Sequence, residues 1–314
     1  MVATVAAHQA STRADARVIG VDVGGTKTLG AVVTRAGAIG VRLERATEAS
    51  SKEALLGSLD GLIEDLRGEA DVAGLGIGIP SRIDQRRGRS IAAVNLPLDG
   101  VDLRDRMREK HGLPVGIDND ANAAAIAEWK AGAARGADNV VMLTLGTGVG
   151  GGLIVDGRPF RGATGSGAEL GHIVIDVDGP PCPCGGNGHL ESYACGPAAD
   201  RVARELFGAE SDAEDLVERA RSGDGVAVEA LGEIGRRLGA GIATLENVFE
   251  PELVVIGGGF GAAGELLLAS AREVVAREGL EPGRDAVRIV EAELGVDAGV
   301  IGAAMIGFEA LDGA

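Results

Sequence analysis

Cysteine and histidine residues form the most specific chemical pattern in this sequence. All three cysteines lie between positions 182 and 195. Cys182 and Cys184 are separated by one residue, His189 follows Cys184 by five positions, and His172 precedes Cys182 by ten. Two thiolates and two imidazoles make a complete tetrahedral ligand set for zinc. The pattern therefore predicts a zinc site formed by these four residues.

Other roles for the cysteines are possible from the pattern alone. Reduced cysteines in a cytosolic chain mark a metal site more often than a disulfide. A lone catalytic cysteine or inert buried thiols are the alternatives. Cys195 stands outside the compact pattern, and we expect it to be a small buried apolar side chain.

A glycine-rich segment near the start of the chain predicts a site for phosphate groups. Its Gly24 and Gly25 follow an apolar run, and without a Cβ they let backbone N–H groups approach phosphate oxygens. Thr26 can donate a hydroxyl hydrogen bond, Lys27 adds positive charge, and Asp22 can hold Mg²⁺ directly or through water. The spacing is not that of a Walker A loop.

A second glycine-rich segment contains Gly146, Thr147 and Gly148. Around it, residues 139–157 repeat the plan of residues 17–35, which is a strand, a glycine turn with threonine, and a strand. One such turn is weak evidence, since any α/β protein contains them. Two turns in matching positions of a repeat predict two phosphate-binding loops on opposite walls of one cleft.

Acidic and amide side chains gather where a strand is expected to give way to a helix, at Asp118, Asn119, Asp120 and Asn122. Ligands of open α/β sheets bind at such strand ends. Phosphoryl transfer needs a positioned hydroxyl, a carboxylate to accept its proton, and compensation of phosphate charge. A helix N-terminus favours the ionised carboxylate. The alternative is that Asp118 or Asp120 only caps the helix.

The elements that must position these groups follow from apolar periodicity. Strands are expected at 18–25, 29–34, 38–47, 72–80, 114–120, 252–260 and 286–294, and on both sides of the second glycine turn. Helices are expected at 53–68, 102–112, 121–136, 198–208, 229–249, 265–279 and 300–311. The alternation predicts an α/β protein.

The repeat predicts two domains. Residues 1–16 lack a strong period and are expected to form a flexible tail. Residues 17–131 would form a small α/β domain, against which a terminal helix at 298–314 packs back. Residues 132–297 would form a larger α/β domain that contains the zinc loop.

Composition disfavours several classes of partner. The 314 residues include 30 basic and 47 acidic side chains, which gives a formal charge of −17. Such a charge repels nucleic acid and anionic membrane surfaces. No apolar run has the length of a membrane span, and none near the start resembles a signal peptide. We expect a cytoplasmic protein.

The motifs resemble, in the same order, those of the ROK family of sugar kinases and repressors, and within it the ATP-dependent glucokinases. The matching stretches are DVGGTK, GIGIP, IDNDANAAAIAE, LGTGVGGG, GAELGHIVID, CPCGGNGHLE and VVIGGGF, which run from Asp22 to about Phe260. The resemblance implies a two-domain actin-like ATPase (ribonuclease H-like) fold with duplicated α/β units around a cleft. It also implies ATP and Mg²⁺ as ligands, with structural zinc, and phosphorylation of a hexose, with glucose as our choice.

The resemblance also implies roles for individual residues. Asp120 would be the general base. The sugar-binding residues would be Asn95, Asn119, Asp120, Glu169, His172 and Glu191. The two glycine turns would hold phosphates, and Gly257, Gly258 and Gly259 would lie near the adenosine. The expected partners are the sugar and ATP, and the family expectation for assembly is a homodimer.

Two positions depart from the family pattern. His189 stands where the family usually has cysteine, so the predicted site is His₂Cys₂, which is still a good zinc set. Ser81 follows Pro80 where the family often has glycine, which leaves the loop beside the sugar open to change.

Two other functions fit parts of the sequence. An oxidoreductase is suggested by Gly259, Gly261 and Gly264, which fit a dinucleotide fingerprint, but only 23 residues follow Glu291 and a Rossmann domain needs more. A DNA-binding repressor would need a winged-helix domain before the first strand, which begins at about residue 18, and the charge disfavours it. Among kinases, mannose, fructose or an N-acetylated hexosamine could replace glucose, and polyphosphate could replace ATP.

Overall fold

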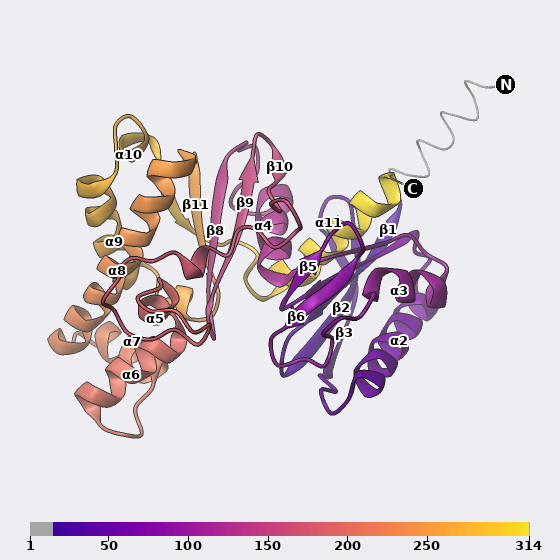
Figure 1. Ribbon diagram of the computed structural model, residues 1–314, viewed down its shortest axis with the longest axis horizontal. Coiled ribbons are helices and arrows are strands. Elements are labelled where there is room, and N and C mark those ends of the chain that lie inside the picture. Colours follow the sequence, from indigo (N-terminus) through magenta and orange to yellow (C-terminus); the bar gives the residue numbers. More distant parts are fainter. Residues whose placement is uncertain (1–14, 314) are drawn as a thin grey trace. The chain divides into compact units, whose positions relative to one another are not determined.

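The computed structural model describes residues 15–313, so the predicted tail lies almost entirely outside the described residues. The described chain divides into two compact units, and Figure 1 labels most of their helices and strands. The first consists of residues 15–135, Arg161–Gly167 and 296–313, and the second of Gly136–Phe160 and Ala168–Gly295. The short excursion of residues 161–167 into the first unit has no counterpart in the sequence patterns.

The first unit is built on a five-stranded sheet with the order β3–β2–β1–β4–β7 in the described chain. Strands β3, β2 and β1 pair antiparallel, and β1, β4 and β7 pair parallel. The sheet strands are β1 (Arg17–Val23), β2 (Lys27–Thr34), β3 (Ile39–Ala46), β4 (Gly74–Ile79) and β7 (Val115–Asn119). A separate hairpin is formed by β5 (Ser81–Asp84) and β6 (Arg89–Ala93). The helices are α2 (Lys52–Glu69), α3 (Leu103–His111), α4 (Asp120–Ala131) and α11 (Ala298–Asp312).

Apolar spacing explains why α2 forms and which face it buries. Ser51 caps its N-terminus by accepting a hydrogen bond from the N–H of Ala54. The buried side chains recur every three or four positions, which places them on one stripe of the helix. They are Leu55, Leu59, Leu62, Ile63 and Leu66, and they join the buried strand residues in one core cluster.

Helix α11, drawn in yellow in Figure 1, packs against the opposite face of this sheet at very close range. The approach depends on glycines in the strands. A Cβ atom at Gly20 of β1 would overlap the carbonyl oxygen of Val300, and one at Gly76 of β4 would overlap that of Ala303. Both positions need glycine because the helix backbone occupies the space of a side chain.

The second unit repeats the sheet plan. Its five strands have the order β10–β9–β8–β11–β12 in the described chain, with β10, β9 and β8 antiparallel and β8, β11 and β12 parallel. The strands are β8 (Val140–Leu145), β9 (Val149–Val155), β10 (Arg158–Pro159), β11 (Leu253–Gly257) and β12 (Arg288–Glu291). The duplication that the glycine turns suggested is thus visible as two sheets of the same topology. The antiparallel strands also differ from the all-parallel sheet of a Rossmann domain.

Helices cover the second sheet and build its core. They are α5 (Glu191–Ala194), α6 (Gly196–Phe207), α7 (Ala213–Arg221), α8 (Gly225–Phe249), α9 (Glu265–Glu278) and α10 (Gly283–Ala286). Short 3₁₀ turns are η1 (Leu170–His172), η2 (Phe260–Ala263) and η3 (Gly295–Asp297). Between residues 15 and 313 no helix is both long enough and apolar enough to span a membrane.

Candidate active site

The acidic cluster of the first unit lies where β7 ends and α4 begins. Asn119 caps the helix: its Oδ1 accepts the N–H of Ala121 at 2.9 Å and that of Asn122 at 3.2 Å. Asp120 is the first residue of α4, and its Oδ1 also accepts the Ala121 N–H, at 2.9 Å. The cap of α4 is therefore Asn119, and the alternative that Asp118 or Asp120 caps this helix is wrong.

Asp118 is held differently from Asp120. Its side chain is fully buried, and its Oδ1 accepts the N–H of Asn119 at 2.8 Å and the Nδ2 of Asn122 at 3.0 Å. Its Oδ2 accepts the Nε of Arg161 at 2.5 Å. All of these partners are protein groups, so both oxygens of the Asp118 carboxylate are occupied within the protein. Asp120, by contrast, is half-buried.

Asp22 lies in the neighbouring part of the same sheet. In the strand register it stands opposite Gly78 of β4, which in turn stands opposite Asp118 of β7. Burial, followed by the nearby Asp120 carboxylate, raises the pKa of Asp22 to about 6, although Lys27 opposes the shift. Burial likewise raises the pKa of Asp120. Two carboxyl groups that repel each other at a strand edge suit the binding of a cation or the acceptance of a proton.

The first glycine turn joins β1 to β2 and is braced from one side. The N–H of Gly24 donates to the carbonyl of Lys27 at 2.9 Å, which closes the turn. Thr47 donates its hydroxyl to the carbonyl of Gly24 at 2.8 Å and its N–H to that of Thr26 at 2.9 Å. Gly25, Thr26 and Lys27 are exposed at the tip. The backbone is thus fixed, while the groups predicted to face phosphate are accessible.

The second glycine turn joins β8 to β9 and lies beside the Gly257–Gly259 segment. Gly257 of β11 pairs with Thr144 of β8, so both segments leave the same edge of the sheet. Gly258 has φ +83°, and a Cβ there would overlap the backbone of Leu145. The structure therefore brings together the turn that contains Gly146, Thr147 and Gly148 and the segment predicted to lie near adenosine.

Glu191 connects the second glycine turn to the cysteine cluster. Its Oε2 accepts the N–H of Val149 at 2.9 Å, and the Cys182 thiol contacts its Oε1 at 3.5 Å. A Cβ at Gly148 would overlap the Glu191 carboxylate, so a larger residue there would displace this side chain. The carboxylate is fixed at the first residue of α5.

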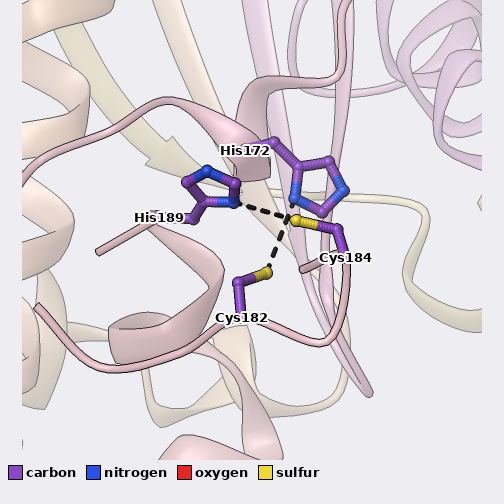
Figure 2. A group of neighbouring side chains, drawn as sticks. All are labelled: His172, Cys182, Cys184 and His189. Atoms are coloured by element: carbon purple, nitrogen blue, oxygen red, sulfur yellow. Dashed lines mark hydrogen bonds between the residues drawn. The ribbon is translucent and has the colours of Figure 1, made fainter. Parts of the chain in front are cut away.

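The four predicted metal ligands converge, as Figure 2 shows. His172 Nδ1 lies 3.8 Å from Cys182 Sγ, and His189 Nδ1 lies 3.2 Å from Cys184 Sγ. The ligand atoms all lie within 4.8 Å of one another. Around a tetrahedral zinc with bonds of about 2.0–2.3 Å, ligand atoms lie roughly 3.3–3.8 Å apart. The donor set and its spacing therefore fit zinc.

The cysteines differ in their surroundings. Cys182 is buried and Cys184 is exposed. Burial, with further contributions from Cys184 and the Glu191 carboxylate, raises the pKa of the Cys182 thiol to about 11 in the protein environment alone. Such a thiol is a poor nucleophile, which disfavours Cys182 as a lone catalytic cysteine. Cys195 is buried beside α6 and does not belong to the cluster.

Asn95 and Glu169, two of the predicted sugar-binding residues, occupy exposed positions next to unusual backbone. Asn95 itself has φ 58°. Glu169 follows Ala168, which has φ 65° and so pays a steric cost of about 1–2 kcal/mol for its left-handed conformation. Strained residues of this kind cluster at functional sites.

Sequence reasoning missed several residues that support the candidates. Arg161 is 43 positions from Asp118, and no spacing rule links them. Thr47 follows β3 with no motif to mark it. Ser81, where the resemblance leaves the loop open to change, begins β5, and its hydroxyl lies 2.8 Å from that of Ser90. Its carbonyl accepts the Nδ2 of Asn119 at 3.4 Å, which links this hairpin to the helix cap.

Two α/β units, each with a five-stranded sheet of the same mixed order, define the actin-like ATPase class of fold. The sequence also matches a family model, ROK family, over residues 18–309. The chain belongs to the ROK family.

Several relatives show how this family is used. The chain is 37% identical to a glucokinase of Halalkalibacterium halodurans over 305 residues, which cover 90% of this chain and 92% of that protein. The crystal structure of a ROK family glucokinase from Streptomyces griseus in complex with glucose and AMPPNP is similar, with a TM-score of 0.82 and 35% identity over 93% of this chain and 99% of that one. A xylose repressor of Caldicellulosiruptor bescii is 35% identical over 244 residues, which cover 71% of this chain and 61% of that protein.

Proposed function

We propose that this protein transfers the γ-phosphoryl group of ATP to glucose, with Asp120 as the general base. The relatives support a hexose kinase as the class of enzyme. Glucose is favoured over other hexoses because the Halalkalibacterium halodurans and Streptomyces griseus proteins are both named as glucokinases. ATP as donor is supported by the ATP analogue in the latter complex.

The contrast between Asp118 and Asp120 carries the assignment of the base. Asp118 is fully buried and its two oxygens accept hydrogen bonds from three protein residues. Asp120 is half-buried at the start of α4, and burial raises its pKa toward the range in which a carboxylate accepts a proton efficiently. Of the two, Asp120 is therefore the better proton acceptor.

In the proposed step the sugar hydroxyl oxygen forms a bond to the γ-phosphorus while the bond from that phosphorus to the β–γ bridging oxygen breaks. ADP leaves with the electron pair, and the hydroxyl proton passes to the Asp120 carboxylate. Mg²⁺ would compensate phosphate charge, and Asp22 is the carboxylate that would hold it. The backbone N–H groups of the two glycine turns, with Thr26 and Lys27, would bind phosphate oxygens.

Sugar recognition is assigned to polar groups with fixed backbone. Asn119, Glu169, His172 and Glu191 are the proposed ligands, together with Asn95. Carboxylates that accept from adjacent hydroxyls are an effective way to hold a hexose. Asn119 is anchored as a helix cap and Glu191 by the Val149 N–H. Asn119 and Glu191 are therefore held before the sugar binds, which lowers the entropic cost of binding.

We also propose that zinc occupies the cluster of His172, Cys182, Cys184 and His189. When bound it would cross-link the four residues. Its charge would favour the deprotonated thiols, and coordination would fix the orientation of the histidine rings. His172 faces Cys182 with Nδ1, so Nε2 is the nitrogen left to meet a sugar hydroxyl. A homodimer and a cytoplasmic location stay predictions.

A coupled assay of ADP release over a panel of sugars tests the proposal. The panel contains glucose, mannose, fructose and N-acetylated hexosamines, and each is tried with ATP and with polyphosphate. We expect the highest kcat/KM with glucose and ATP. A preference for another sugar would correct the substrate, and no turnover with any hexose would refute the kinase.

A further inference from the structure

Arg161 makes two ion pairs that no sequence motif predicted. Its Nε donates to Asp118 Oδ2 at 2.5 Å, and its Nη2 donates to Glu309 Oε2 at 2.9 Å. Asp118 is the buried acid of β7, and Glu309 lies on α11 with a side chain 42% exposed. Burial opposes a charged guanidinium, but the two carboxylates outweigh it and raise the pKa of Arg161. The guanidinium is thus fixed between an inner and an outer acid.

Through Asp118 the guanidinium is connected to the proposed base. The other oxygen of Asp118 accepts the Asn119 N–H and the Asn122 side-chain amide, both in the segment that starts α4. Asp120 lies between these two residues in the chain. The Asp118 carboxylate accepts hydrogen bonds from residues on both sides of Asp120, and Arg161 neutralises its charge. It therefore fixes the backbone that carries the proposed base.

The backbone of Arg161 is connected to the second set of proposed sugar ligands. Its carbonyl accepts the N–H of Gly167 at 3.0 Å and so closes a loop over residues 161–167. Within the loop the carbonyl of Thr164 accepts the N–H of Gln85 at 3.1 Å. Gly167 is followed directly by the strained Ala168 and then by Glu169. A strained residue persists only where its surroundings over-determine it, and the closed loop supplies that restraint.

We infer that Arg161 is a positioning residue for the phosphoryl transfer, which holds Asn119 and Asp120 through its side chain and Glu169 through the loop that its backbone closes. This inference rests on the proposed function. It assigns Asp118 to the same device, as the buried anion that Arg161 neutralises, and Glu309 as the weaker outer partner. Residues 161–167 belong to the first unit, and Ala168 follows them directly in the chain.

Kinetics of Arg161 variants test the inference. For Arg161→Ala we expect kcat/KM for glucose to fall by about 10²-fold, since misplacement by about 1 Å costs that much. The KM for glucose should rise by roughly tenfold, while the KM for ATP changes less than about threefold, because the glycine turns are not attached to Arg161. Arg161→Lys should be intermediate, because an ammonium keeps the charge but loses the fork geometry. Glu309→Gln should have the smallest effect, because the outer pair is exposed.

Two controls separate positioning from stability. Arg35→Ala removes a comparable pair with α11, in which Arg35 contacts Asp312 at 2.6 and 2.9 Å, and it should leave both KM values unchanged. Guanidinium ion is added at concentrations that leave the wild type folded. It should restore part of the activity of Arg161→Ala, and it should restore no activity to Asp120→Asn. A purely structural role would lower the melting temperature without a selective rise in the glucose KM and without rescue.

Folding failure of the single variant would not end the test. The double variant Arg161→Ala with Asp118→Asn removes the unpaired buried charge, and we expect it to fold and keep the raised glucose KM. Wild-type glucose KM and kcat in either folded variant would overturn the inference alone. A wild type that turned over no hexose in the same assay would instead overturn the proposed function, and the inference with it.

Discussion

The two units share one sheet order but hold their candidate groups by different means. In the first unit Asp22, Asn119 and Asp120 stand at the ends of β1, β7 and α4, all regular elements with buried neighbours. In the second, His172, Cys182, Cys184 and His189 stand in or beside residues 173–190, which carry no helix and only two isolated bridges in the described chain.

This difference shows what holds each set of side chains in a defined position. Strand ends and helix caps fix side chains through backbone hydrogen bonds that the fold makes anyway. The irregular segment is held by turn and bridge hydrogen bonds, such as the one that the N–H of Cys182 donates to the carbonyl of Gly186 at 2.8 Å, and four converging ligands can add a cross-link to it. Chemistry in the first unit should thus fail when one carboxyl group changes, and in the second when the cross-link is lost.

The largest effect is expected from Asp120→Asn. The amide cannot accept the hydroxyl proton, so kcat should fall by at least about 10²-fold, the scale of a lost general base. Glucose binding should weaken little, because the backbone of α4 still begins at Asn119. Steady-state kinetics and calorimetric titration with glucose measure the two quantities.

Asp118→Asn is the matched control for that variant, since it makes the same chemical change two residues away. We expect it to lower stability and raise the glucose KM while most of kcat at saturating glucose is retained. An active Asp120→Asn enzyme beside a dead Asp118→Asn enzyme would move the general base to Asp118.

Loss of the cross-link should have the next largest effect. We expect about one zinc per chain by metal analysis, and a fall in activity of roughly 10- to 100-fold on strong chelation, the scale for groups that orient a site's inner residues. Cys184→Ser should reproduce it, whereas Cys195→Ser, also a cysteine but outside the cluster, should bind zinc normally. Full activity in protein shown to lack zinc would refute the metal site.

Local patterns were enough to predict most of the regular elements. The apolar runs predicted β1, β2, β4 and β7 because these strands are largely buried in one sheet, and β3 was predicted although its residues alternate between half-buried and exposed. The glycine turns revealed the repeat because phosphate-binding loops need glycine at fixed places. Within the second unit, the four ligands were found because they lie within 18 residues of chain.

The contacts between distant segments were not predictable in this way. The β5–β6 hairpin consists of short strands with charged residues between them, so it has no clear period. The pair of Arg161 with Asp118 joins segments 43 residues apart, and nothing in either segment specifies the other. Such contacts follow from the tertiary fold, and only a three-dimensional structure reveals them.

A moderate, pH-dependent effect is expected from Asp22→Asn. Folding raises the pKa of Asp22 from its ordinary 3.8 to about 6, so the folded state binds the proton more tightly than the unfolded chain. Below pH 3.8 both states are protonated and there is no penalty, but above pH 6 the buried charge destabilises the fold. Asp22→Asn should therefore raise the free energy of unfolding by about 1–3 kcal/mol at pH 8 and hardly at all at pH 4.

Urea unfolding at the two pH values measures this difference. In an Asp120→Asn background the gain at pH 8 should shrink, because one cause of the shift is the Asp120 charge. Activity should fall even though stability rises, since Asp22 is the proposed Mg²⁺ ligand. An equal gain at both pH values would contradict the assigned cause.

The smallest effects are expected at two helix caps, one in each unit, which lie outside the candidate sites. Ser51 caps α2 through one hydrogen bond of 3.1 Å, and Asp224 caps α8 with Oδ1, which accepts from Val226 at 3.0 Å and from Ala227 at 3.4 Å. Each change to alanine should cost about 1 kcal/mol of unfolding free energy. Asp224→Ala should cost more, because its negative charge also meets the positive end of the helix dipole, and that excess should decline in high salt. Asp224→Asn keeps the acceptor and should lose only the salt-sensitive part.

Neither Ser51→Ala nor Asp224→Ala should alter kcat or the glucose KM, because neither helix start bears a candidate ligand. A kinetic defect in Ser51→Ala or Asp224→Ala would show that stability alone can imitate the losses assigned to Asp120 and the cysteine cluster, and the contrast between the two units would then need another basis.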